Sequence, residues 1–337
     1  MPGLENKSIT IELPDTFTAL LSDKYAYGTQ SSTHSHSYPP PTIAVKMRLF
    51  LLPVSTRRTL IYAERVQLQL AAGAKPPLQD RLITRVSDTW AKWEKAEKGW
   101  QKKLTTYGNQ GLRRIPFEEW GLKSLPSANK QRLEDASSGK VKYECLYPGA
   151  FVKEASVPAI LSRLATERQG LHSKRMWNCL IFAPFTIPFA LVPVIPNIPF
   201  FYLMFRAWSH YKALYGSKML EHLTKNNLIK AIPSQEMDER YAAGLLHPSQ
   251  QHARDADPPS KEEIAYMAKN AEAQTEGGKT EVMLLESWNG SLLAESFKLP
   301  ELDIEVERAV WQAENAIKGD AQKEKDAAAL KTGDQTK

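Results

Sequence analysis

Apolar residues are concentrated in one part of this chain. From Met176 to Phe205 there are 30 consecutive residues without Asp, Glu, Lys, Arg or His. An uncharged apolar run longer than about 18 residues is typical of a membrane segment. A buried core helix of that length would need a large soluble domain around it. The pattern therefore predicts that this run enters a membrane.

Five prolines interrupt the run, and each removes a backbone donor and clashes with the preceding helical turn. They are Pro184, Pro188, Pro193, Pro196 and Pro199. Asn197 can cap a second helix, with Pro199 tolerated in its first turn. We therefore expect two short helical legs, 176–192 and 198–214, with these prolines and Asn197 forming the break or hinge.

The flanks of the run carry similar charge. Residues 156–175 and 206–225 each have a net charge of +3. Positive flanks prefer the same side of a membrane, which favours an even number of crossings. A hairpin is thus favoured, and a single kinked span stays open as the alternative.

Outside the run, the clearest pattern is helical. Ser260 and Glu263 form a capping box, and Pro300 opens a last helix. The apolar face of that helix comprises Leu302, Val306, Ala309, Val310, Ala313 and Ile317. We expect a mainly α membrane protein with one proline-broken apolar hairpin, or a single kinked span. A basic N-terminal segment and an acidic helical C-terminal segment flank it.

Charge divides the 337 residues into unlike parts. Residues 47–175 carry 24 Lys and Arg against 12 acidic residues, whereas residues 206–337 have a net charge of −5. The expected organisation has six segments: a disordered extension 1–46, a basic N-terminal domain 47–175, a membrane hairpin and interfacial helix 176–224, a linker 225–259, a helical C-terminal region 260–319 and a disordered tail 320–337.

Two basic segments allow more than one interpretation. Leu49–Val54 is interpreted as a buried strand and, with the neighbouring arginines, as part of a mitochondrial import signal that starts at Met47, and the two interpretations are compatible. The helical segment 80–106 interleaves Trp90, Trp93 and Trp100 with lysines. These tryptophans can anchor the helix to its own domain, lie at a membrane interface or hold RNA. Direct binding of nucleic acid is not the favoured interpretation.

Motifs for catalysis are missing from the sequence. There is no P-loop, Gly-rich dinucleotide loop, HExxH or GxSxG pattern. The two cysteines exclude a multi-thiolate zinc site. We therefore expect no enzyme activity, no cofactor and no metal.

A charged residue and a titratable residue lie at the C-terminal edge of the apolar run. Arg206 is always charged, and His210 has an unperturbed pKa of about 6.5. Trp208 and Tyr211 suit the headgroup level of a membrane. These four residues are the interfacial or pH-responsive candidates.

Three blocks resemble the fungal mitochondrial K+–H+ exchange-related family. They are MRLFLLPVSTRRTLIYAE (47–64), NIPFFYLMFRAWSHYKALYGSK (197–218) and LPELDIEVERAVWQ (299–312). The resemblance implies a protein of the mitochondrial inner membrane that supports potassium–proton exchange. Residues 184–197 also look like the proline-broken segment of a larger inner-membrane family linked to the same exchange and to mitochondrial ribosomes.

Three hypotheses follow. The protein is a subunit or regulator of an exchange complex, a carrier formed by oligomerisation, or a membrane tether for mitochondrial ribosomes or protein assembly. The first is favoured, because the apolar run contains no Asp, Glu, Lys, Arg or His that could take part in ion transport. The expected partners are membrane lipid and either other inner-membrane proteins or further copies of the chain, with K+ and H+ as possible transported ions.

Overall fold

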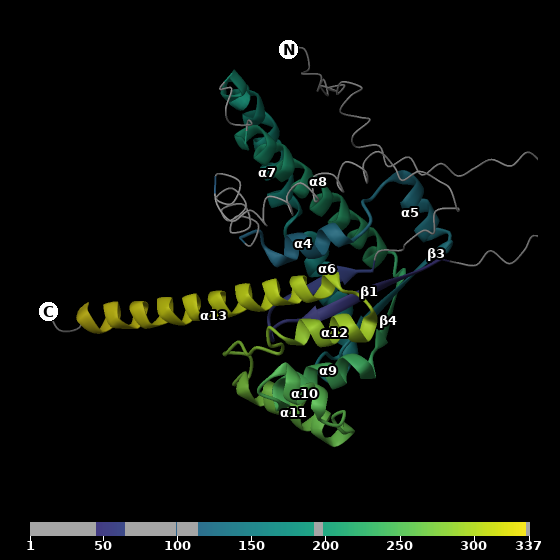
Figure 1. Ribbon diagram of the computed structural model, residues 1–337, viewed down its shortest axis with the longest axis vertical. Helices are drawn as coiled ribbons and strands as arrows, with labels where there is room; N and C mark the ends of the chain where they lie inside the picture. The colour runs from purple at the N-terminus through teal and green to yellow at the C-terminus, as the bar shows by residue number, and fades with distance from the viewer. Residues whose placement is uncertain (1–44, 65–98, 100–113, 192–197, 335–337) are drawn as a thin grey trace, which may run out of the picture. The chain divides into compact units, whose positions relative to one another are not determined.

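The computed structural model describes residues 45–64, 99, 114–191 and 198–334 (Figure 1). Strands and helices alternate irregularly along this part of the chain. In chain order they are β1 (Val45–Pro53), β2 (Thr59–Ala63), α4 (Phe117–Ser124), α5 (Lys130–Ser137), β3 (Val141–Tyr147), the 3-10 helix η1 (Glu154–Ser156), α6 (Val157–Thr166), α7 (Gln169–Phe182), the 3-10 helix η2 (Ala183–Leu191), α8 (Ile198–Lys225), β4 (Ile229–Pro233), α9 (Gln235–Leu246), α10 (Gln250–Asp255), α11 (Lys261–Gln274), α12 (Asn289–Phe297) and α13 (Glu301–Asp334).

The strands form one mixed sheet in the order β2-β1-β3-β4. β1 and β2 are an antiparallel hairpin in which Leu51 is paired with Ile61. β3 runs parallel to β1, and β4 runs parallel to β3. Parallel pairing needs long connections. Here the chain between β3 and β4 contains α6, α7 and α8.

Helices cover both faces of the sheet. Phe50 and Leu52 point to one face, where they pack with residues of α9, α12 and α13. Leu49 and Leu51 point to the other face, where they pack with residues of α4, α6 and α8. All four side chains are fully buried. The uninterrupted apolar sequence of β1 is therefore that of a strand buried on two sides.

Two glycines fix the position of α4 between the sheet and α8. A Cβ atom on Gly121 would lie 2.3 Å from the carbonyl oxygen of Ile61 in β2. A Cβ atom on Gly216 in α8 would lie 2.0 Å from the carbonyl oxygen of Leu122 in α4. Both distances are too short for any side chain, so the backbones approach closely only because these residues are glycine.

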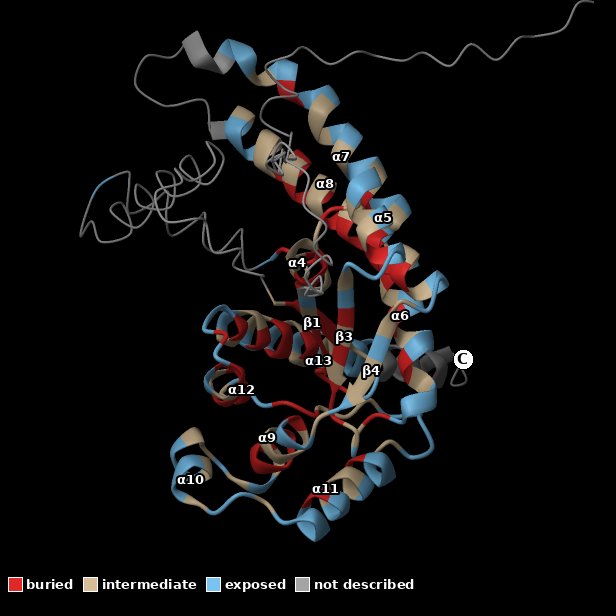
Figure 2. Cartoon of the chain, turned by 90° about the vertical axis from the view of Figure 1, so that its right-hand side faces the viewer, coloured by how far each residue is buried: buried red, intermediate tan, exposed pale blue. Residues whose placement is uncertain are grey.

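The described parts of the apolar run form two helical legs that pack against each other. α7 and η2 make the first leg and the start of α8 makes the second, and the legs run side by side in both views (Figures 1 and 2). Pro184 and Pro188 lie in η2, and Pro199 lies in the first turn of α8. Pro193, Pro196 and Asn197 fall outside the described residues.

The expected fold class is wrong. The protein is a mixed α/β structure around a four-stranded sheet, not a mainly α structure. Among the described helices, none combines the length and the apolar character that crossing a bilayer requires. The physical reason lies in the helix bounds: α7 includes Lys174 and Arg175, and most of the length of α8 lies beyond Phe205 and includes several charged residues.

Two further expectations are confirmed by the structure, and two expected segments have a different structure. The capping box at Ser260 is confirmed, and the expected apolar face of α13 is buried from Leu302 to Ala313. Residues 225–259, the expected linker, instead hold β4, α9 and α10. α13 continues to Asp334, well into the expected tail. Nearly all of the extension 1–46 and almost all of the segment 80–106 lie outside the described residues.

Candidate functional site

A cluster of charged and polar side chains is buried where the α7–α8 hairpin meets α4. α4 contributes Glu119 and α7 contributes His172. α8 contributes Arg206, Ser209 and His210, which share one helix face because they are three and four positions apart. Each of the five is at most 8% exposed. Such burial of ionisable groups is rare unless they are paired.

An ion pair forms the centre of the cluster. Arg206 donates from Nη1 to Glu119 Oε1 at 2.8 Å and from Nη2 to Oε2 at 3.1 Å. The Ser209 hydroxyl also donates to Oε1, at 2.6 Å. Burial by itself raises the pKa of Glu119, but the hydrogen bonds and charge of Arg206 and the bond from Ser209 outweigh it and hold the pKa below its usual range. Glu119 is therefore a fixed carboxylate that joins α4 to α8.

Two histidines extend this network towards α7. Arg206 Nη2 lies 3.0 Å from His210 Nε2, and His210 Nδ1 lies 3.1 Å from His172 Nδ1. Because a guanidinium only donates, His210 Nε2 must accept, which places the proton of the neutral ring on Nδ1. That proton is then donated to His172 Nδ1. The remaining nitrogen, His172 Nε2, is buried without a partner among the described residues.

The same three elements bring together groups that could hold a metal ion. Glu119, His172 and His210 each offer a ligand atom, and these atoms lie within 4.8 Å of one another. A carboxylate and two imidazoles are a common zinc ligand set. However, an ion bound to both Nδ1 atoms would move the proton of His210 to Nε2, against the Arg206 donor. The arrangement therefore favours a shared proton over a cation while Arg206 stays in place.

The titration behaviour of the cluster follows from its burial. Burial lowers the pKa of both His172 and His210 to about 4, with the Glu119 carboxylate opposing the shift. Both rings are thus neutral near pH 7. Lys123, one turn along α4, donates to the Ser209 hydroxyl at 3.0 Å. Burial lowers the pKa of Lys123 to about 7, so this amine is the group of the cluster that titrates near neutral pH.

The structure separates the residues that the sequence grouped together. Arg206 and His210 belong to the buried cluster, whereas their expected position was a membrane interface. Trp208 and Tyr211 are partly buried on α8 and contact other aromatic rings: Trp208 lies 6.3 Å from Phe205 and Tyr211 lies 4.5 Å from Tyr215, between ring centroids. Whether these four residues respond to protons or lipid stays a prediction.

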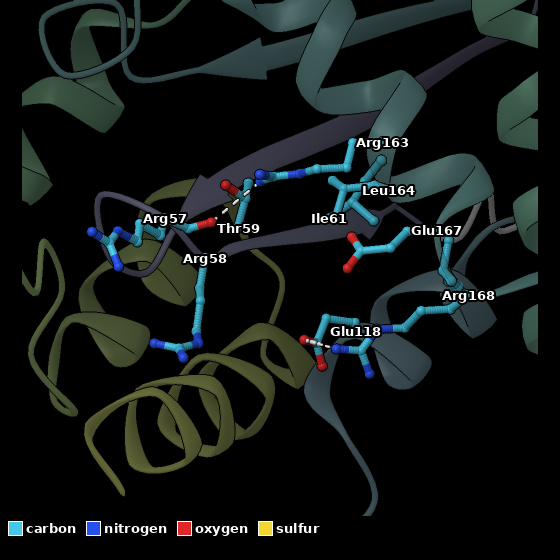
Figure 3. A pocket seen from close by; sticks show the side chains of 10 residues that line it. Arg57, Arg58, Thr59, Ile61, Glu118, Arg163, Leu164, Glu167 and Arg168 are labelled. Carbon is cyan, nitrogen blue, oxygen red and sulfur yellow. Dashed lines mark hydrogen bonds and ion pairs between the residues drawn. The ribbon is translucent and has the colours of Figure 1, made fainter. Parts of the chain in front are cut away.

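A separate pocket lies beside β2 and α6 (Figure 3). It has a volume of about 190 Å³ and is lined by four arginines, Arg57, Arg58, Arg163 and Arg168. Arg168 forms an ion pair with Glu118 at 2.6 Å, and Arg58 forms one with Glu281. Arg57 and Arg163 donate to backbone carbonyl groups. Because protein groups already engage these guanidinium groups, the pocket is a weaker candidate than the buried cluster.

Comparison with known proteins places the chain in a family. Residues 48–224 match the mitochondrial K+-H+ exchange-related family, and this match covers more than half of the 337 residues. The chain belongs to this family. The matched region contains α4, α7 and α8, and thus the whole buried cluster. The resemblance inferred from the sequence blocks is confirmed, and the family name indicates a mitochondrial role related to potassium–proton exchange.

Two relatives of the chain are fungal proteins. An uncharacterized protein of Schizosaccharomyces pombe is 28% identical over 193 residues, which are 57% of this chain and 82% of that protein. An uncharacterized protein of Saccharomyces cerevisiae is 25% identical over 203 residues, which are 54% of this chain and 63% of that protein. No solved structure matches the chain.

Sequence reasoning found only two members of the cluster. Arg206 and His210 were visible because they are charged residues at the edge of an uncharged run. Glu119 is 87 positions from Arg206 along the chain, and no periodicity connects them. One signal for this cluster is local. In the short helix α4, Gly121 lies between the charged residues Glu119 and Lys123. A glycine at that position lets another backbone approach the helix closely.

Proposed function

We propose that the protein is an accessory or regulatory subunit of potassium–proton exchange at the mitochondrial inner membrane, and not the ion carrier itself. The family assignment supports the connection to exchange. The regulatory part of the proposal rests on one observation, the state of Glu119. Both oxygens of this buried carboxylate are engaged by Arg206, and one is also engaged by Ser209.

A carrier needs oxygen ligands that can exchange K+ with water. Glu119 is 1% exposed, and the guanidinium of Arg206 occupies the position that a cation would take. The function of the Glu119–Arg206 ion pair in the fold is to hold α8, and with it the hairpin, on α4. We therefore assign this buried charge a structural and regulatory role.

Lys123 gives the cluster a route for sensing protons. Its Nζ lies 3.1 Å from the centre of the Trp120 ring and donates to Ser209, which in turn donates to Glu119. Deprotonation removes a positive charge from beside the ion pair that holds the hairpin. A regulator of this kind would report pH to a separate carrier through the position of the hairpin.

Two measurements test the proposal together. The first is potassium-acetate swelling of mitochondria that lack the protein, and the second is potassium flux in liposomes that contain only the purified full chain. We expect slower swelling without the protein and no flux in the liposomes. Flux with the purified chain alone would make it a carrier. A normal swelling rate with impaired mitochondrial translation or protein assembly would favour a tether instead.

A further inference from the structure

The far end of the hairpin exposes large apolar side chains at unusual density. We define the hairpin end as residues 176–188 and 199–205. Its exposed large apolar side chains are Trp177, Ile181, Phe182, Phe185, Ile187, Phe201 and Tyr202. Phe185 is 73% exposed and Phe201 is 63% exposed. Contiguous apolar exposure of this kind marks an interaction surface.

The charged residues that flank the hairpin end in the sequence are all basic. Residues 168–220 contain no Asp or Glu but six Lys and Arg. Lys174 and Arg175, next to the hairpin end on α7, are both exposed (Figure 2 shows exposed residues of α7 in pale blue). Arg206 does not contribute to this surface, because it is buried against Glu119. The surface is thus apolar at its end and cationic just behind it.

We infer that the hairpin end docks on an anionic lipid surface, with its apolar side chains at the acyl boundary and with Lys174 and Arg175 at headgroup level. Phe182 lies seven positions after Arg175 in α7, which is a rise of about 10 Å at about 1.5 Å per residue. Phe185 and Ile187 lie further along the same leg, so the exposed apolar side chains of this leg follow the two cations. The contact is at the surface and does not require either helix to cross the bilayer.

The position of the aromatic side chains favours lipid over a protein groove. An amphipathic helix that docks in a groove presents anchors from one helix face. Here the exposed rings come from α7, from η2 and from the start of α8, so they follow the end of the hairpin and not one face of one helix. A fluid surface can surround such an end. This inference goes beyond the proposed exchange function and is tested independently of it.

The test is sedimentation of the purified full chain with vesicles of phosphatidylcholine, with and without an anionic phospholipid. We expect binding to the anionic vesicles that weakens in high salt, because salt screens the contribution of the basic residues. F182S together with F185S should lower the partition coefficient by about 10- to 100-fold. K174Q together with R175Q should lower it roughly tenfold, and on anionic vesicles only.

Matched controls use exposed residues outside the hairpin. Y266S with W311S removes two exposed aromatic side chains, and K261Q with K269Q removes two exposed positive charges. Neither pair should change vesicle binding by more than about twofold. Equal loss in the control variants overturns the inference, as does failure of the wild-type chain to bind anionic vesicles. Dimerisation that the F182S and F185S changes abolish, without vesicle binding, identifies a surface for self-association and also overturns it.

Discussion

The two ends of the α7–α8 hairpin reverse the usual placement of residues. At its base, a carboxylate, a guanidinium and two imidazoles are buried. At its far end, phenylalanine, tyrosine and tryptophan are exposed. Folding alone explains neither arrangement well, since well-packed apolar groups often replace a buried ion pair without loss of stability, and exposed aromatic side chains gain little from the fold. The difference indicates that the base controls where the hairpin lies and the end makes a contact outside the chain.

The largest effect should come from breaking the buried ion pair. R206M leaves Glu119 buried without its partner, which typically costs about 3–5 kcal/mol of unfolding free energy. Adding E119L should recover most of that loss, because the pair is then replaced by apolar groups. As a control, R254A removes an exposed ion pair with Glu295 and should cost under about 1 kcal/mol. Urea denaturation measures all three. Equal losses for R206M and R254A would show that the buried pair has no special role.

Close packing at the base should be the next most sensitive feature. G216A places a Cβ atom 2.0 Å from the Leu122 carbonyl oxygen, which pushes α8 away from α4. We expect a loss of about 1–3 kcal/mol, measured by thermal or chemical unfolding. G170A, in α7, has no atom within 4 Å of the new Cβ and should be neutral or slightly stabilising. A neutral G216A would contradict the contact between these helices.

The histidines predict instability in acid. Their folded pKa of about 4 lies below the ordinary value of 6.5, so the unfolded chain binds more protons between these values. The unfolding free energy should therefore fall as the pH drops from 6.5 towards 4. Glu119 opposes this shift, while Arg206 and Arg175 add to it. The double variant H172Q with H210Q should show a shallower slope in pH-dependent denaturation, and an unchanged slope would place the acid sensitivity elsewhere.

Lys123 predicts the opposite trend at higher pH. Its folded pKa of about 7 lies below the ordinary 10.5, so the unfolded chain binds more protons across that window. The unfolding free energy should rise as the pH increases from 7 to 10.5. Glu119 and Glu305 favour the charged amine, Arg206 and Arg308 oppose it, and the Trp120 ring also favours it. K123M should remove this rise, and a rise that persists in K123M must come from another group.

The smallest effect on stability should come from the hairpin end. F182S and F185S change exposed side chains, so each should alter the unfolding free energy by less than about 0.5 kcal/mol. A larger loss, seen in the same urea denaturation, would mean that these rings pack inside the protein. The hairpin end would then belong to the core of the protein and would not be an exposed contact surface.

Local patterns predicted local structure well. The capping box at Ser260 and the apolar face after Pro300 depend on residues close together in the chain, and the structure contains both of them. The sheet was missed because three of its strands have five to seven residues, because α6, α7 and α8 separate β3 from β4, and because only β1 has a strong strand pattern. β3 and β4 become strands through pairing with distant residues.

The expectation that the apolar run forms membrane-spanning helices was wrong for a similar reason. A sequence shows that 30 residues lack charge, but not which of the flanking charges lie within the same helices. Arg206 was expected to extend towards headgroups, yet its partner Glu119 neutralises it inside the protein. Pairing across 87 positions has no periodic signal, so only the fold reveals it.

The most direct test of the whole account is potassium-acetate swelling of mitochondria in which the protein is replaced by the F182S and F185S double variant. We expect this variant to be folded and normally abundant but to fail to restore swelling, because the base of the hairpin is intact and its contact surface is lost. The Y266S and W311S variant should restore swelling fully. Full restoration by the F182S and F185S variant would contradict the claim that the hairpin end connects this protein to exchange.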